Sequence, residues 1–135
     1  MTTLSGDQPR DYYKGDFHDF PVIAADIIYQ GAAVGDNGAG YARPLVAGDP
    51  FRGFAEMTAD NATGAAGAVN VRCRTKGKIQ LAIASLAITD VGKTVYASDD
   101  NTFTLTATSN SAIGTVSSWV STGLGVIDFA AQGNN

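Results

Sequence analysis

The sequence has a single cysteine, Cys73, and a single histidine, His18. One cysteine cannot form an intramolecular disulfide, and its position in an alternating apolar stretch favours a small buried hydrophobe over a reactive thiol. One histidine leaves too few partners for a serine–histidine–acid arrangement or for a zinc site. We therefore expect a protein that is not an enzyme, with no catalytic, cofactor-binding or metal-binding residues and no small-molecule substrate.

Positive charge and long apolar runs are also scarce. The chain has nine lysine and arginine residues against thirteen aspartate and glutamate residues, a net charge of −4, whereas a nucleic-acid binder needs a basic surface. The longest apolar run, residues 81–88, is far shorter than the ~20 residues of a membrane span. The first ten residues have no apolar signal core. We expect neither a nucleic-acid nor a membrane partner.

Glycine, in contrast, is abundant, with 16 residues in a chain of 135. Such a content is expected of short strands that are joined by tight turns. The length suits one domain, and we expect it to span residues 21–135.

The stretch from Val69 to Ile83 alternates apolar and polar residues, which is the pattern of half-buried strands. A three-residue loop, Thr75-Lys76-Gly77, would place Cys73 opposite Ile79 and put every apolar residue on one face. Gly77 suits the third loop position, which needs a positive φ. This stretch therefore predicts a β-hairpin.

Two further hairpins are predicted by the same pattern. The first pairs Ala97 with Phe103, and Val95 with Leu105, across residues 99–101, with Asn101 in the left-handed region. The second turns at residues 121–123. Its predicted opposite pairs are Val120 with Leu124, Ser118 with Val126, and Trp119 with Gly125.

The last hairpin carries apolar residues on both of its predicted faces. A strand pair of this kind is either fully buried or lies at a subunit interface. One face has Val116, Val120, Leu124 and Val126, and the other has Trp119, Ile127 and Phe129.

The remaining segments are consistent with an all-β fold. Residues 21–29 predict a strand broken near Asp26, with a short helix as the less favoured reading. Residues 41–46 predict an edge strand, because Pro44 cannot donate to a strand ladder. Residues 86–90 predict a connection of about one helical turn. Together with the three hairpins, these segments predict one β-rich domain.

Residues 1–20 predict an extended N-terminal arm. The segment is polar and has no sustained period, yet it is too rich in aromatic residues for a plain disordered tail. The rings either lie on the surface of a partner or cap the core of the same domain. They are Tyr12, Tyr13, Phe17 and Phe20.

Four of the nine basic residues crowd into one predicted hairpin: Arg72, Arg74, Lys76 and Lys78. In the predicted register Lys78 lies opposite Arg74, and like charges at opposite positions are mildly destabilising. The set is either a solvated face or a docking patch for an acidic surface. With the arm aromatics and Trp119, these residues form the set of candidate protein-interaction residues.

Two short motifs are weaker candidates for chemistry. Residues 87–94 fit a loose phosphate-loop pattern that ends in Gly92-Lys93-Thr94, but a strand rather than a helix is predicted to follow. Residues 99–101 carry two aspartates without the liganding positions of a calcium loop. Both motifs are interpreted as plain turns.

Three segments of the chain resemble the capsid cement, or head decoration, proteins of tailed bacteriophages: residues 40–81, 90–105 and 112–129. The specific marks are Arg74-Thr75-Lys76-Gly77, the turn and strand DVGKTVY at residues 90–96, and Gly114. The resemblance covers roughly residues 20–130. It is a pattern of turns and strands without a catalytic signature.

The resemblance implies a β-tulip or related barrel that forms a homotrimer on the outer surface of the virion. Its partner would be the major capsid protein, whose neighbouring subunits it would clamp against internal DNA pressure after assembly in the host bacterial cytoplasm. Two alternatives stay open. One is a tail or fibre component that binds host glycans through exposed Tyr and Trp side chains, and the other is a nucleotide hydrolase that uses Gly92-Lys93-Thr94.

Overall fold

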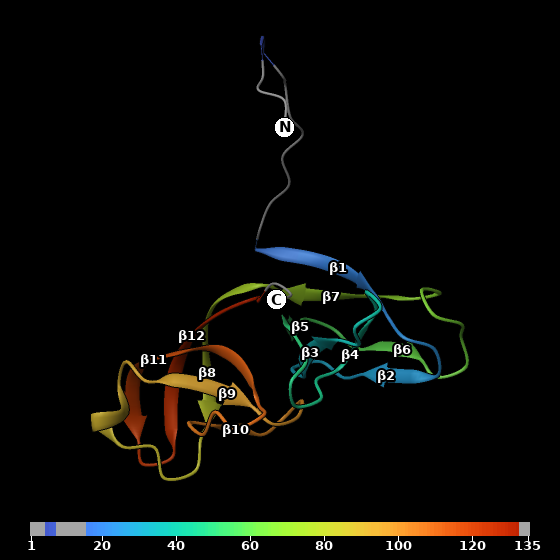
Figure 1. Cartoon of the computed structure of the whole chain (residues 1–135). Helices are drawn as coiled ribbons and strands as arrows, with labels where there is room; N and C mark the ends of the chain where they lie inside the picture. The colour runs from blue at the N-terminus through green and yellow to red at the C-terminus, as the bar shows by residue number, and fades with distance from the viewer. Residues whose placement is uncertain (1–4, 8–15, 133–135) are drawn as a thin grey trace.

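The computed structural model describes residues 5–7 and 16–132, and its regular structure is almost entirely antiparallel β-sheet (Figure 1). The strands form two five-stranded sheets and one two-stranded sheet. The single helical element in the described residues is one 3-10 turn, η1 (Ile88–Asp90), at the connection where one helical turn was predicted. The all-β class is therefore confirmed.

The first sheet has the strand order β1-β7-β5-β3-β4. β4 is an edge strand, as its proline predicted. The strands are β1 (Phe17–Pro21), β7 (Asn70–Arg74), β5 (Phe51–Ala55), β3 (Ala33–Asp36) and β4 (Ala42–Pro44). A small sheet of β2 (Asp26–Ile28) and β6 (Ala59–Asn61) accompanies it.

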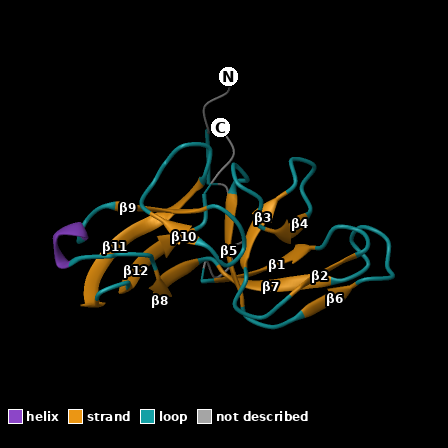
Figure 2. Cartoon of the chain, turned by 90° about the horizontal axis from the view of Figure 1, so that it is seen from below, coloured by secondary structure: helices purple, strands orange, loops and turns teal. Residues whose placement is uncertain are grey.

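The second sheet has the order β10-β9-β11-β12-β8 and lies beside the first (Figure 2). One isolated bridge, Ile83 with Phe103, joins its two edge strands at one end. The strands are β8 (Lys76–Ala82), β9 (Thr94–Ala97), β10 (Phe103–Thr104), β11 (Ser111–Ser121) and β12 (Leu124–Ala130).

The larger hydrophobic core lies between the two five-stranded sheets. At its centre Phe54 packs edge-on against Phe129 with ring centroids 5.0 Å apart, and it also contacts Phe51 and Phe103 at 5.4 and 5.9 Å. Aromatic pairs at these separations favour edge-to-face geometry. Residues from both sheets thus share one aromatic centre.

A smaller core covers the opposite face of the first sheet. There β2 and β6 close over the sheet, and Val71 and Cys73 of β7 point into this core. The first sheet is therefore buried on both faces near its centre, which explains why all four residues of β3 are buried.

A bulge in β5 lets Phe51 and Phe54 share one face. The β3–β5 register shifts between Val34 and Gly35: Val34 pairs with Gly53 and Gly35 pairs with Phe51, so position 52 is the extra residue of the ladder. The bulge requires glycine at position 53: its φ is +122°, and a Cβ there would overlap the carbonyl group of Arg74.

The first predicted hairpin is wrong, because its two strands do not pair with each other. The prediction of which residues point to the core is nevertheless confirmed. β7 pairs with β1 and β5, whereas β8 pairs with β12 in the other sheet. Val71 and Cys73 are nevertheless buried between exposed neighbours, and Leu81 is buried on β8. Thr75 is not part of a loop between paired strands, because the chain crosses there from one sheet to the other.

The second hairpin is confirmed in register by the pair Phe103–Ala97. The ladder ends at Thr104, so the expected pair of Val95 with Leu105 is not formed, and Asn101 is not among the residues with positive φ. The carboxylate of Asp99 instead accepts a hydrogen bond from the Asn101 N–H at 2.8 Å, which closes the turn.

The third hairpin is confirmed at Ser118–Val126 and Trp119–Gly125 but not at its tip. Leu124 pairs with Ser121, because the register shifts between Trp119 and Ser121 and leaves Val120 as the extra residue of a bulge. The turn has two residues instead of the predicted three.

A second register shift, between Val116 and Ser118, corrects the predicted faces of this hairpin. Val116 pairs with Ile127, and both are buried in the larger core together with Phe129. The outer face retains Leu124 and Val126, which are half-buried. The two apolar faces are real, but Val116 belongs to the core side.

The boundary of the predicted arm also changes, because residues 17–20 form most of β1 and belong to the first sheet. Tyr12 and Tyr13 lie outside the described residues. Residues 21–29 confirm the broken strand: β1 ends at Pro21, a turn at residues 24–25 follows, and β2 begins at Asp26.

Candidate interaction surface

The candidate surface lies on β1 and β7, at one edge of the first sheet. In the antiparallel register Phe17 pairs with Arg74, and Asp19 pairs with Arg72. Paired residues point to the same side of a sheet, so these four side chains share one face. Phe54 pairs with Arg74 on the same face and lies in the larger core. The exposed side chains therefore lie beyond the area that the second sheet covers.

Phe17 is held between two arginines on this face. The guanidinium carbons of Arg72 and Arg74 each lie 4.8 Å from the centroid of the Phe17 ring. A cation over an aromatic face is attracted by the ring quadrupole, and such contacts contribute about 0.5–1 kcal/mol at exposed sites. We call this arrangement the arginine–phenylalanine stack.

The basic side chains of the surface have acidic neighbours. Arg74 lies 3.4 Å from an oxygen of Glu56, and Lys76 lies 3.6 Å from the carboxylate of Asp16. Arg74, Lys76 and Asp16 are largely exposed and Glu56 is half-buried, and exposed pairs contribute little to stability. The neighbours reduce the local positive charge without burying it.

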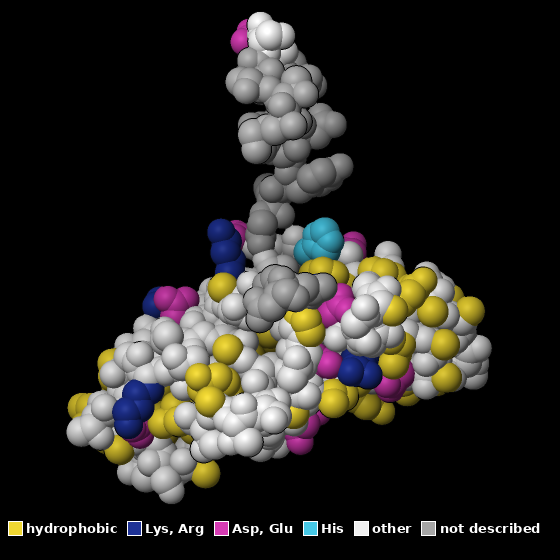
Figure 3. All heavy atoms as spheres, viewed as in Figure 1, with side chains coloured by type: hydrophobic (Ala, Val, Ile, Leu, Met, Phe, Trp, Pro, Cys, Tyr) yellow, Lys and Arg dark blue, Asp and Glu magenta, His cyan; other side chains and the backbone are white. Residues whose placement is uncertain are grey.

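Lys78 does not belong to this surface, contrary to the predicted register. It lies on β8 in the second sheet, pairs with Asp128 and donates a hydrogen bond to the Ser117 hydroxyl. The four basic residues are therefore split between two sheets. On the face that Figure 3 shows, the visible basic side chains are scattered, each beside an acidic one, rather than gathered into one field.

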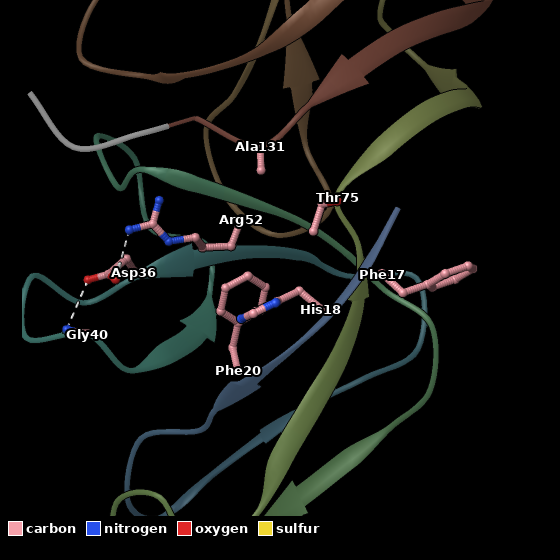
Figure 4. Close-up of a pocket in the computed structure, with 8 residues that line it drawn as sticks. All are labelled: Phe17, His18, Phe20, Asp36, Gly40, Arg52, Thr75 and Ala131. Carbon is pink, nitrogen blue, oxygen red and sulfur yellow. Dashed lines mark hydrogen bonds and ion pairs between the residues drawn. The ribbon is translucent and has the colours of Figure 1, made fainter. Parts of the chain in front are cut away.

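A shallow depression of ≈ 510 Å³ opens on the other side of β1. His18 and Phe20 lie together on this side, with ring centroids 4.6 Å apart, while Phe17 points away from them (Figure 4). Arg52 crosses the depression, pairs with Asp36 at 3.1 Å and also donates to the carbonyl oxygen of Gln132. Arg52 thereby ties the end of the described chain to β3.

The remaining predicted interaction residues have structural contacts. Trp119 donates from Nε1 to the carbonyl oxygen of Leu86 at 3.2 Å and packs against the larger core. Phe20 packs against the smaller core. A half-buried indole with its N–H in use is a poor platform for a sugar.

The residues that were candidates for chemistry are either buried or engaged in other contacts. The Cys73 side chain is fully buried, and burial, with a smaller contribution from Asp19, raises the pKa of its thiol to about 12. Lys93 pairs with Asp90 at 2.8 Å, and strand β9 comes directly after it. Among the described residues no three His, Cys, Asp or Glu side chains are grouped as a metal site.

The sequence did not indicate the arginine–phenylalanine stack, because the pairing of β1 with β7 joins segments about fifty residues apart. The signal that could have found it is the alternation Phe17, Asp19 against Arg72, Arg74. These residues make complementary cross-strand pairs once the strands are placed side by side.

No protein-family model matches the chain, and no curated protein or solved structure matches it either. Within the described residues, no helix combines the length and the apolar character that a membrane span requires.

Proposed function

We propose that this chain is a structural virion protein that binds the outer surface of a tailed-phage capsid. In this role it links neighbouring major capsid subunits and stabilises the DNA-filled head. The observation that carries the proposal is the arginine–phenylalanine stack, because it presents two cations on β7, next to the edge strand β1, in an otherwise acidic protein. The resemblance of residues 20–130 to capsid cement proteins supports the same assignment.

The chemistry of the stack suits an acidic protein surface. Stacking on Phe17 orders both guanidinium groups before binding, which reduces the side-chain entropy that is lost when a partner docks. Arginine forms planar, two-pronged hydrogen bonds with carboxylates. Strand β1 is also an edge strand, so its free side can pair with an extended segment of the partner.

A homotrimer is part of the proposal. The contact surface is assigned to the tip of the last hairpin and the neighbouring η1 segment. The two lie together because the Gly123 N–H at the tip donates to the carbonyl oxygen of Leu86, two residues before η1. Three large apolar side chains are exposed in this region: Ile88, Val91 and Val120. Three copies held together bind a shell with far higher avidity than one, often by ~10²–10⁴.

The test is co-sedimentation of the purified protein with expanded, undecorated heads from a panel of tailed phages. The double variant Arg72→Glu/Arg74→Glu is expected to reduce binding at low salt by more than about tenfold, since like charges across an interface repel. Lys78→Glu is the matched control, because Lys78 is an exposed cation on β8 in the second sheet, outside both the stack and the proposed trimer contact. This variant is expected to bind like the native protein.

Deletion of residues 1–15 tests the arm while leaving β1 whole. Unchanged head binding in this variant would remove the arm from the proposal. Unchanged binding in the double arginine variant would remove the stack. Binding to a glycan array, with no binding to any head, would favour the tail or fibre alternative instead.

A further inference from the structure

The turn between β3 and β4 contains the one Asn-Gly pair of the sequence, Asn37-Gly38. The side-chain amide of an asparagine can be attacked by the backbone nitrogen of the next residue, and glycine in that position leaves the approach unhindered. Gly38 has a φ of +90° and nothing within 4 Å of its missing Cβ. Asn37 is half-buried and Gly38 is exposed, so water reaches the turn.

The attacking nitrogen is hydrogen-bonded to a carboxylate. The Gly38 N–H donates to Oδ1 of Asp36 at 2.7 Å, and the Gly40 N–H donates to the same oxygen at 3.3 Å. Burial raises the pKa of Asp36, but hydrogen bonds from Gly38, Arg52 and Gly40 outweigh this effect and hold the pKa below its usual value. Asp36 is therefore an ionised acceptor at neutral pH.

The amide that would be attacked is also polarised. Oδ1 of Asn37 accepts hydrogen bonds from the N–H groups of Ala39 at 2.8 Å and Tyr41 at 3.2 Å. Two backbone donors on a carbonyl oxygen stabilise the negative charge that develops there when a nucleophile adds to the carbon. The turn thus holds a nucleophile, a proton acceptor and an oxyanion-stabilising pair within a few consecutive residues.

From this arrangement we propose that Asn37 is a site of self-modification by cyclisation with Gly38. The Gly38 nitrogen bonds to Cγ of Asn37 and gives up its proton towards Asp36. The bond between Cγ and Nδ2 then breaks, and Nδ2 leaves with that proton as ammonia. Water next opens the five-membered imide on either side, which yields aspartate or isoaspartate at position 37. Water is the only reactant besides the chain itself, and no oxidant is needed.

The products change the turn in two ways. Each adds a negative charge beside Asp36, which is already ionised and paired with Arg52. Isoaspartate also inserts one extra backbone atom into the β3–β4 hairpin. This turn sets the register of that hairpin, which runs from the pair Asp36–Ala42 to the pair Val34–Pro44. The modified chain is expected to lose order at the β3–β4 edge first.

The experiment measures deamidation of the full chain at neutral pH by mass spectrometry of its tryptic peptides. Peptide 15–52 contains Asn37 as its only asparagine, so its conversion is read directly, and heavy-oxygen water marks the hydrolysis. The native protein is expected to convert Asn37 about tenfold faster than the same chain held in urea, because base and oxyanion contacts exist only in the folded turn.

The control and a second variant separate this mechanism from ordinary ageing. Asn101, an exposed asparagine followed by threonine, is expected to convert no faster in the native protein than in urea. Asp36→Asn is expected to lower the native rate at Asn37 to the rate in urea. A native rate at Asn37 equal to or below the rate in urea would overturn the proposal, whether or not the Asp36 variant folds.

Discussion

Gly53→Ala offers the sharpest test of the fold, because the bulge in β5 sets the position of β7 and hence of the stack. Gly53 has a φ of +122°, and a Cβ on it would overlap the Arg74 carbonyl group and lie 3.2 Å from Cα of Thr75. These are backbone atoms, which cannot rotate away as a flexible side chain can. β7 must therefore separate from β5 if an alanine is placed there.

The expected loss has two contributions. A non-glycine residue at positive φ costs about 1 kcal/mol. Separation of the strands adds the net value of the hydrogen bonds near Phe54–Arg74 and Ala55–Cys73, about 1 kcal/mol each. The total is about 3 kcal/mol of unfolding free energy, which corresponds to a drop in Tm of roughly 10–15 °C in a chain of this length.

Gly92→Ala is the matched control, since Gly92 has a φ of +93° but nothing within 4 Å of the added Cβ. It is expected to lose only the φ contribution, about 1 kcal/mol. Urea unfolding curves and thermal melts of the two variants and the native protein measure the difference. A Gly53→Ala protein as stable as the Gly92→Ala protein would refute the assigned bulge.

Two further predictions concern buried groups. Cys73 is expected to be inert to a thiol reagent in the native protein at neutral pH, because its pKa is raised to about 12, and to react once urea unfolds the chain; rapid labelling without urea would contradict its burial. Asp36→Asn is expected to cost about 1–3 kcal/mol at neutral pH. Folding lowers the pKa of Asp36, so the ionised carboxylate stabilises the folded protein. This contribution to the unfolding free energy is fully present above the pKa of the unfolded chain, about 3.9, and is lost as the pH falls through the pKa in the folded protein. The difference between native and variant unfolding curves should therefore shrink in acid, and a constant difference would contradict the assignment.

Alternation along the chain predicted which residues share a face, and it did so well. The exposed and buried residues of β7 alternate as expected, and so do those near the end of β8. The alternation does not identify the strand with which a given strand pairs, however. Two strands joined by a hairpin and two strands joined by a crossover between sheets show the same alternation. The first hairpin failed for this reason, whereas the other two have ladders between strands adjacent in the chain.

The sequence did not predict the register shifts, at which one strand has one more residue between two paired positions than its neighbour has. The bulges next to Gly53, at Ser117 and at Val120 each insert one residue and change the face on which the later residues of the strand lie. The first of them allows Phe51 and Phe54 to meet in the aromatic centre. Alternation in a single sequence gives no sign of where such an insertion lies, so a face assignment fails beyond a bulge even where the strand itself is correct.

The crossover at Thr75 connects the fold to the proposed function. Its N–H donates to the carbonyl oxygen of Asp16 at 2.9 Å, and its own carbonyl oxygen accepts from the N–H of Ala131 at 2.7 Å. The start of β1, the corner between the two sheets and the end of β12 are thus tied at one residue. If the proposed function is right, a load that a capsid partner placed on β1 would pass through the β1–β7 ladder to this corner and be shared by both sheets. Strand β1 alone would be a weak anchor, since it pairs with a single neighbour; tied at Thr75, it can unpeel from its N-terminal end only if this corner opens.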